Sequence, residues 1–588
     1  MADTTAGGVT QRAPVEVFVR HSSGLVRQMS AGDALIGNVL IFNLVIASVT
    51  LLVVPFTFPG ASLPLGIILA FIPAGLIAAV YVFFSVAMPR AGGDYVFISR
   101  TLHPAIGFAA NFSFVGWNAI WIGVYSNWVA TVGLSGLFAS LALTGNGTFW
   151  SGLASGVSGQ WAAFLIGTVV NIAIAGIVMM GLRPALRVMK ALFYVGTFGV
   201  LVAIVVVGVT SNSAFIAGVN HITSYQGLVD AAHKAGYASP ASWTDLGPTV
   251  LSVGLLSLSM IFVMYSAYTG GEVKNASRSL PISIFGALLV GGVLFLLMGI
   301  VAVNSWGNDF MAEINTVFYT ASSSYTLAAA PNYNYLAAIG NPNLLLILLI
   351  NLGWVLIPIA AIIFNYIPNS RCVFAWSFDR IFPMRAAQVS DRFHSPVVAT
   401  IIVAVGAEAS IVGYTFLGTS QFLGGTVMGY SATFITTAIA AIFFPYLKRS
   451  KAIYEASPLK PSLAGIPVMT IVAVLTVVVF GVMIFGFLSA IEPIKKQVGE
   501  VLPLILTRLR MDKRQGEAEI LRVWRHLIDP TITAHAQPTG LHKGTLFVAV
   551  DSNVWLDEIV RYRRKEILDR LQHSFGRELI QRISFRAG

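Results

Sequence analysis

Long apolar runs separated by short polar stretches dominate the sequence up to about residue 490. A helix that crosses the hydrocarbon core of a bilayer needs about 20 mainly apolar residues. Eleven runs meet this requirement, at residues 34–57, 63–87, 106–141, 161–181, 190–210, 249–270, 282–303, 343–366, 396–416, 422–446 and 465–489. They predict an all-α membrane protein with eleven transmembrane helices over residues 31–492, preceded by a polar cytoplasmic segment at 1–30.

The pattern changes sharply near the C-terminus. Residues 495–588 hold 17 Lys and Arg against 11 Asp and Glu, so this region is both charged and basic. Helical patterns lie at about 498–509, 515–527 and 553–573, and strand patterns at about 535–541, 545–551 and 580–586, with Gly544 at a turn. We therefore expect a small soluble α+β domain over residues 498–588.

The connections between the apolar runs alternate between basic and non-basic. Those after the second, fourth, sixth, eighth and tenth runs carry the Lys and Arg residues, whereas 142–160 and 304–342 have none and 211–248 has only Lys234. The positive-inside rule places the basic set, and with it the N-terminus, in the cytoplasm. The expected location is the cell (inner or plasma) membrane.

Composition narrows the class of protein. Only 10% of the residues are charged, and no G-x-x-x-x-G-K-[ST] loop is present. We therefore expect neither an enzyme nor a primary pump, and no cofactor or metal. A channel is the competing class, but channels usually carry a repeated pore signature, and none is visible. A single cysteine, Cys372, excludes an internal disulfide.

Three motifs resemble the APC superfamily of amino acid–polyamine–organocation transporters. Residues 88–95 (MPRAGGDY), followed by 103–108 (HPAIGF), match the loop between its second and third spans. Residues 268–275 (YTGGEVKN) match its sixth-span signature, and 371–383 (RCVFAWSFDRIFP) match its loop after the eighth span. Order and spacing agree over about residues 30–490.

The resemblance implies a five-plus-five inverted repeat in which spans 1 and 6 are broken near mid-membrane. The amides of the first break would bind a substrate carboxylate. That break would fall at Ile36, Gly37, Asn38 and Val39, although Val39 stands where many members have glycine. Asn43 would either supplement these contacts or form an interhelical hydrogen bond.

The second break would fall within residues 265–270. The candidate substrate-binding residues there are Tyr265, Ser266, Ala267, Tyr268, Thr269 and Gly270. Tyr268 stands where an aromatic gate is expected, and an ordinary packed aromatic is the equal alternative. The adjacent Gly270 and Gly271 suit a chain whose backbone groups leave the helical pattern.

Three ionisable residues are candidates for coupling or gating: Glu272, Glu408 and Lys190. Glu408 lies inside a predicted span, where burial of a charge is costly and usually functional. Glu272 is expected to join a cytoplasmic network with Lys274 or Arg278, and Asp33 to cap a helix. The coupling ion, H⁺ or Na⁺, stays open, with proton coupling or exchange favoured because span 8 offers no hydroxyls at 343–364.

The substrate class follows only from charge. Spans 1–8 lack buried acidic residues, which disfavours a polyamine or arginine, since a cationic substrate would need a counter-charge. A neutral or aromatic amino acid is the better expectation, with other amines as alternatives. A transport-incompetent sensor and an amine channel remain alternatives, and the oligomeric state is open.

The basic tail resembles the DciA-like domain, a KH-like module associated with replicative helicase and DNA. The resemblance rests on Trp524, residues 528–530 (IDP), 534–538 (AHAQP), 544–546 (GTL), 550–555 (VDSNVW) and 583–586 (ISFR). It implies a helicase or DNA partner. Five basic residues on one helix would contact phosphates, lipid headgroups or only solvent: Arg561, Arg563, Arg564, Lys565 and Arg570.

The two halves conflict in topology. Members of the superfamily usually have twelve spans, and an odd count of eleven would place the tail outside the cell. Span 11 is then re-entrant, or the tail is external, or the chain is an artefactual fusion in which the tail replaces span 12. We favour the fusion, because a helicase-associated domain has no use outside the cell.

Overall fold

The computed structural model describes residues 26–418, 425–490, 524, 527–542, 544–575 and 580–587. The chain packs into two compact units that divide between Phe487 and Leu488. Each unit has its own hydrophobic core. They are therefore described separately.

The first unit is helical. Its N-terminal helices are α1 (Ala31–Phe42), α2 (Leu44–Thr57), α3 (Leu63–Ala87), α4 (Asp94–Thr101), α5 (Pro104–Trp128), α6 (Ser135–Leu141), α7 (Gly147–Ser158), α8 (Gln160–Met179), α9 (Leu182–Val209), α10 (Asn212–Ile222) and α11 (Tyr225–Lys234). The others are α12 (Leu246–Leu256), α13 (Ala276–Ser305), α14 (Asn308–Thr320), α15 (Tyr333–Gly340), α16 (Leu344–Phe378), α17 (Val397–Phe416), α18 (Gly425–Phe443), α19 (Lys448–Glu455) and α20 (Val468–Ala490).

Shorter elements connect them. A π-helical segment, η1 (Val129–Leu134), joins α5 to α6, and 3₁₀ turns form η2 (Ala142–Thr144), η3 (Met260–Phe262), η4 (Tyr265–Tyr268), η5 (Ser322–Ser324) and η6 (Met384–Ala387). Strands β1 (Ser462–Leu463) and β2 (Ile466–Pro467) form a small antiparallel hairpin before α20.

Nine helices in the described part of the chain are long and apolar enough to cross a membrane. A bent pair, Gly429–Phe443 with Lys448–Glu455, makes a tenth if it counts as one span. The predicted run at 249–270 falls short because α12 ends at Leu256, and the chain stays outside α-helix until Ala276. The molecule is thus a multi-pass membrane protein, as predicted, although fewer than eleven unbroken spans are present in this part.

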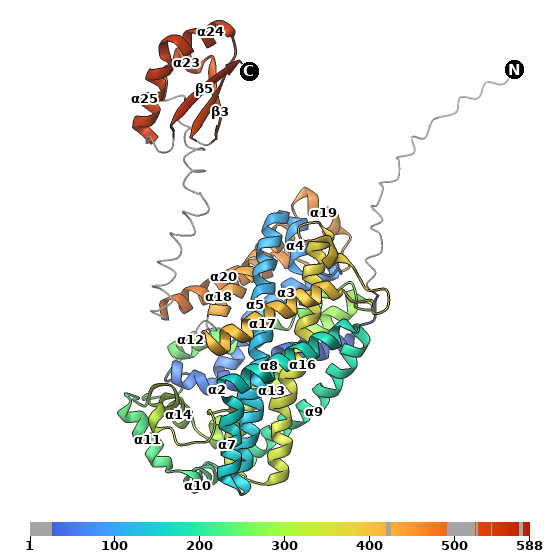
Figure 1. The fold of residues 1–588 in the computed structure, drawn as a ribbon, viewed down its shortest axis with the longest axis vertical. Helices are drawn as coiled ribbons and strands as arrows, with labels where there is room; N and C mark the ends of the chain where they lie inside the picture. The colour runs from blue at the N-terminus through green and yellow to red at the C-terminus, as the bar shows by residue number, and fades with distance from the viewer. Residues whose placement is uncertain are drawn as a thin grey trace, which may run out of the picture. The chain divides into compact units, whose positions relative to one another are not determined.

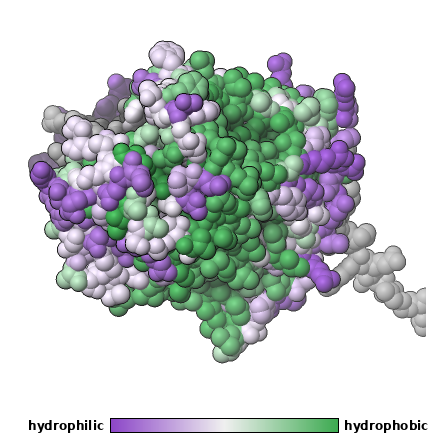
Figure 2. All heavy atoms as spheres, turned by 90° about the horizontal axis from the view of Figure 1, so that it is seen from below, coloured by the Kyte–Doolittle hydropathy of each residue, from purple (hydrophilic) through white to green (hydrophobic). Residues whose placement is uncertain are grey.

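The surface of the first unit agrees with a lipid environment. Figure 2 shows a broad hydrophobic face with hydrophilic residues on both sides. Large apolar side chains that are mostly exposed lie on several spans, including Val169, Val205, Leu289 and Val405. Exposure of this extent is unfavourable in water, but it is expected where acyl chains are the solvent.

The loops gather at two ends. Figure 1 places α4 and α19 at one end of the helical unit and α7, α10, α11 and α14 at the other. The first pair belongs to the basic connections and the second group to the connections poor in Lys and Arg. The two classes of loop predicted from charge therefore lie on opposite sides of the spans.

The second unit is a small α+β domain. Strands β3 (Ala536–His542), β4 (Thr545–Val550) and β5 (Arg582–Ala587) form a sheet in the order β3-β4-β5, antiparallel and then parallel. Gly544, with φ of 76°, makes the predicted turn. Helices α23 (Pro530–Thr533), α24 (Asn553–Glu558) and α25 (Arg564–Phe575), with the π-helical η8 (Ile559–Arg563), complete it. The helices predicted at 498–509 and 515–527 lie almost wholly outside the described residues.

Candidate substrate site and gate

Span 1 is interrupted at Asn43, about one turn beyond the predicted break. Asn43 has φ of 52°, in the left-handed region, and separates α1 from α2. Its Oδ1 accepts hydrogen bonds from the amides of Val45 and Ile46 at 3.0 and 3.3 Å, which caps α2. Asparagine tolerates this backbone conformation better than most residues. The break predicted at 36–39 is therefore wrong in position, and Asn43 is itself the hinge.

Residues 36–39 stay helical for local and tertiary reasons. Ser30 and Asp33 form a capping box that starts α1, as expected for Asp33, so the amides of 36–39 lie inside the helix. Gly37 is needed for packing: a Cβ there would lie 2.2 Å from the Phe364 ring of α16. Ile36 and Val39 are buried with their neighbours. The glycine predicted to free backbone amides instead allows two helices to approach closely.

Asn38 joins the two interrupted spans. Its Nδ2 donates to Oγ of Ser266 at 2.9 Å, and its Oδ1 accepts from the amide of Ser266 at 2.9 Å. Both residues are fully buried. An amide in an irregular segment needs such a partner, since a buried unpaired amide costs about 1–3 kcal/mol. Two of the predicted substrate-binding residues are thus in direct contact.

The interruption of span 6 agrees with the sequence. Residues 265–270 lie outside α-helix, in η4 and the turn that follows it. The hydroxyl of Thr269 donates to the carbonyl of Ser266 at 2.9 Å. Ala267 is buried, and the backbone at Gly270 packs on Pro89. The predicted break of span 6 is therefore confirmed, and the loop after α3 supports it.

Aromatic side chains surround this irregular segment. Tyr268 stacks on Phe114 of α5 with ring centroids 4.4 Å apart, and its hydroxyl is 3.1 Å from that of Tyr81. Tyr265 and Tyr430 both donate to Oδ1 of Asn118, the latter at 2.8 Å. Tyr268 is fully buried, so it is a packed aromatic in this structure. Its role as a gate stays a prediction.

Several buried donors at this cluster have no protein partner among the described residues. They are Nδ2 of Asn118, Nε1 of Trp121 and the hydroxyls of Ser259 and Ser431. Asn118 and Trp121 are three residues apart on α5, so they share one helix face. Buried polar groups in proteins are nearly always satisfied. A polar ligand bound here would supply the missing acceptors, which the sequence alone did not indicate.

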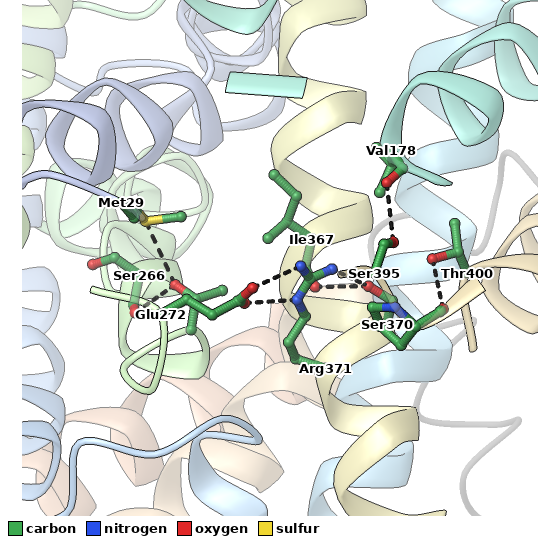
Figure 3. Close-up of polar contacts among 11 residues, drawn as sticks. Met29, Val178, Ser266, Glu272, Ile367, Ser370, Arg371, Ser395 and Thr400 are labelled. Atoms are coloured by element: carbon green, nitrogen blue, oxygen red, sulfur yellow. Dashed lines mark hydrogen bonds and ion pairs between the residues drawn. The ribbon is translucent and has the colours of Figure 1, made fainter. Parts of the chain in front are cut away.

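A buried ion pair closes one end of the site. Glu272 and Arg371 are each about 1% exposed, with Nε to Oε2 at 2.7 Å and Nη2 to Oε1 at 2.9 Å. Figure 3 shows Arg371 reaching from α16 toward Glu272, with Ser370 accepting from its third nitrogen. The expected partners Lys274 and Arg278 are exposed instead. The predicted network at Glu272 exists, but its cation was wrongly assigned.

The chain before α1 adds to this closure. The amides of Gln28 and Met29 both donate to the carbonyl of Glu272 at 3.0 Å, and Met29 pairs with Val273 in a short parallel bridge. Nearby, Lys190 of α9 forms an ion pair with Asp33 at 2.8 Å, with Lys190 37% exposed. The gating candidates Glu272 and Lys190 therefore both hold the N-terminal end of span 1.

Glu408 lies apart from this cluster, on α17. Its carboxylate accepts from Thr168 at 2.5 Å and from Nδ2 of Asn171 at 2.9 Å, both on α8. Tyr366 of α16 donates to the side-chain carbonyl of the same Asn171. Glu408 is thus half-buried and held by neutral groups from neighbouring spans, and its role in coupling or gating stays a prediction.

No role was predicted for Asp94 from the sequence, although it lies in the motif at residues 88–95. Asp94 is fully buried at the start of α4, and its Oδ1 accepts from Nδ2 of Asn111 at 2.5 Å. Oδ1 of Asn111 accepts in turn from Nε1 of Trp376 at 2.8 Å. Desolvation raises the pKa of Asp94 to about 7. The local signal was an acidic residue directly after Gly92 and Gly93 in the motif at 88–95.

The basic residues of the second unit divide into two groups. Three of the five form ion pairs along the helix: Arg561 with Asp557, and Arg563 and Arg570 with Glu566. Arg564 and Lys565 are exposed and form no ion pair within the described residues. Of the five basic residues predicted to contact an anion, these two are therefore the ones without a partner in the described part of the chain.

The chain is thus a multi-pass membrane protein in which two interrupted spans meet at a buried polar and aromatic cluster. A family model described as "Amino acid permease" matches residues 38–506, and the chain belongs to this family. The match confirms the predicted APC resemblance, and the chain is a transport protein rather than an enzyme. A second model, described as "Dna[CI] antecedent, DciA", matches residues 497–585 and confirms the predicted nature of the tail.

Curated relatives are transporters as well. The chain is 24% identical to the methylthioribose transporter of Bacillus subtilis over 78% of this chain and 90% of that protein. It is 25% identical to the vacuolar cationic amino acid transporter 2 of Arabidopsis thaliana over 66% of this chain and 55% of that protein. The relatives thus differ in the substrates that their names state.

Proposed function

We propose that the helical unit is a secondary active transporter of amino acids that works by alternating access. The observation that carries this proposal is the contact of Asn38 with Ser266, which ties the two interrupted spans together beside unpaired donors on α5. Buried donors without a protein partner, set among aromatic side chains, suit a carboxylate or another polar group. The candidate contacts are the predicted residues at 36–39 and 265–270, with Asn43 as the hinge.

A neutral or aromatic amino acid fits the site best. Two of the acidic groups near it already have cationic partners, Glu272 with Arg371 and Asp33 with Lys190. These two carboxylates are therefore not free to serve as counter-charges for a cationic substrate, and the rings of Phe114, Tyr268 and Tyr430 favour an apolar side chain. The names of the relatives keep methylthioribose and cationic amino acids as alternatives.

The proposed topology is a five-plus-five inverted repeat with a cytoplasmic N-terminus, in a transporter domain at 31–492. Two observations support it. Both interruptions fall in the first span of their half, and the basic loops lie at the end opposite to the loops poor in Lys and Arg. The ion pairs of Glu272 and Lys190 would then form a closed cytoplasmic gate.

Counterflow in proteoliposomes tests the proposal. Vesicles loaded with unlabelled phenylalanine, leucine, arginine or methylthioribose are diluted into the labelled compound, and only a carrier shows stimulated uptake. We expect stimulation by phenylalanine or leucine that exceeds that by arginine. Uptake without stimulation would indicate a channel, and no uptake of any probe would contradict the proposal.

The tail is proposed to bind DNA or a replicative helicase, with anionic headgroups as the alternative ligand. The match to the DciA model and the exposed Arg564 and Lys565 support this. A natural fusion requires one transcript across the boundary near residue 490. Two separate transcripts would favour the artefactual fusion, and a tag after Gly588 reached only from the cytoplasm would exclude an external tail.

A further inference from the structure

Asp94 is a buried carboxyl that forms no ion pair with any residue the structure describes. It lies in the loop between α3 and α5 and is 0% exposed. None of the ion pairs within the described residues includes it. One oxygen accepts from Asn111, whereas Oδ2 has no hydrogen bond of normal geometry in the described part of the chain. Such a group binds a proton more readily than an exposed aspartate does.

The groups that face Asp94 are neutral. The charge of an ionised Asp94 would interact electrostatically with three nearby groups: Tyr81 of α3, Tyr268 of η4 and Cys372 of α16. Desolvation has the largest effect on the pKa of Asp94 and favours the protonated carboxyl. Asn111 of α5 and the Tyr268 hydroxyl act in the opposite direction and favour the ionised carboxylate. Two further helices, α18 and α19, pack on α4. Thr437 of α18 interacts with the Tyr81 hydroxyl, and Arg449 of α19 donates to the backbone carbonyl of Leu102.

Tyr268 connects this carboxyl to the interrupted span. Its ring packs directly on Gly93, where a Cβ would lie 2.3 Å away, and its carbonyl accepts from the amide of Gly92 at 3.0 Å. Its hydroxyl is 3.1 Å from that of Tyr81, and either can be the donor. The loop that carries Asp94 therefore moves only if Tyr268 moves with it.

The protonation state of Asp94 sets the direction of donation along this chain of hydroxyls. An ionised carboxylate favours donation from Tyr268 to Asp94, with Tyr81 donating to Tyr268. A protonated carboxyl can itself donate to Tyr268, which then donates to Tyr81. One proton on Asp94 thus changes the hydrogen bonding of Tyr268, which lies in the interrupted span and stacks on Phe114 of α5.

We propose that Asp94 is a proton-binding site of this carrier, coupled through Tyr268 to movement of the interrupted part of span 6. This proposal rests on the proposed transport function and adds to it a proton as the coupled ion. Perturbed buried carboxyls beside moving elements are a general sign of functional sites. The predicted candidates Glu272 and Glu408, by contrast, accept a hydrogen bond at each of their two carboxylate oxygens.

Infrared difference spectroscopy of the purified full-length protein tests the site without any substrate. The carbonyl band of a protonated carboxyl is recorded between about pH 5 and pH 9. We expect a band that titrates near neutral pH, is lost in Asp94→Asn and is kept in Asp391→Asn, an exposed control. A band that is unchanged in Asp94→Asn, or none that titrates near neutral pH, would overturn the proposal.

A second variant keeps the test valid if Asp94→Asn does not fold. Asn111→Leu retains the carboxyl but removes the donor to its ionised form, so the midpoint should rise by about one pH unit. An unchanged midpoint in Asn111→Leu would count against Asp94 as the titrating group.

The coupling is tested by the pH dependence of counterflow with the probe that shows the strongest exchange. Wild-type protein and Asp391→Asn should show a rate that changes across neutral pH, and Asp94→Asn a rate that does not. An equal pH dependence in Asp94→Asn would refute the coupling. Absence of counterflow with every probe would refute only the transport function, because the infrared titration is independent of it.

Discussion

Asn38 of α1 and Ser266 of η4 exchange two hydrogen bonds, each 2.9 Å long, although 228 residues separate them. The side chain of Asn38 replaces the helical partner that the amide of Ser266 lacks in the interrupted span. The contact therefore stabilises the irregular segment and fixes its position against span 1 at the same time.

Asn38→Leu should lower the rate of counterflow about 10- to 100-fold, equivalent to roughly 1.4–2.8 kcal/mol. The substitution removes both hydrogen bonds and leaves the amide of Ser266 unpaired in a buried site. The control is Thr400→Val, which loses one hydrogen bond within its own helix, to the carbonyl of Pro396, and should remain within about threefold. Equal losses in both variants would show that Asn38 has no special role.

Arg371→Met should lower the free energy of unfolding by about 3–5 kcal/mol, because it leaves Glu272 charged and unpaired in a buried site. The double variant Glu272→Leu with Arg371→Met should recover most of that loss, since neither charge is then buried alone. Thermal unfolding in detergent measures both. A double variant as unstable as the sum of its singles would contradict a direct pair.

Asn43→Val should destabilise the protein by about 2–3 kcal/mol. A β-branched residue in the left-handed region costs about 1–2 kcal/mol, and loss of the cap on α2 adds about 1 kcal/mol. Asn43→Gly keeps the backbone conformation and should lose less than about 1 kcal/mol. If the two variants were equally stable in thermal unfolding, the hinge would not require a left-handed residue.

Stability should depend on pH through Asp94. Burial raises its pKa to about 7 in the folded state, above the unfolded value near 4, so the folded protein binds the proton more tightly. The resulting stabilisation is fully present below about pH 4 and is lost as the pH rises through 7. The thermal midpoint of the wild-type protein should fall between about pH 5 and 8 more steeply than that of Asp94→Asn, which lacks this contribution. Parallel curves would show that Asp94 does not titrate in this range.

Charge reversal of Arg564 and Lys565 should weaken binding of single-stranded DNA by the full-length protein at least tenfold at low salt and reduce its salt dependence. Reversal of Arg561, which already pairs with Asp557, is the matched control and should have a smaller effect. Fluorescence anisotropy with labelled DNA measures both. Binding that moved instead to anionic vesicles would identify headgroups as the ligand.

Much of the candidate site was predicted from a resemblance that short motifs carry. The irregular segment at 265–270 was expected because residues 268–275 match a sixth-span signature and contain the adjacent Gly270 and Gly271, and the tail strands follow from alternation around Gly544. The hinge in span 1 was misplaced because the resemblance implied a break at the position of Gly37. Its absent Cβ in fact accommodates Phe364, a residue far away in the sequence.

The sequence by itself determined the apolar spans, because in lipid each backbone amide must bond within its own helix, and that requirement is local. It also determined the change to a basic α+β tail. Tertiary structure alone decided which charges meet: Arg371 rather than Lys274 for Glu272, and, within the described residues, no ion pair for Asp94. Such pairings depend on which distant helices pack together, and no spacing along the chain records that choice.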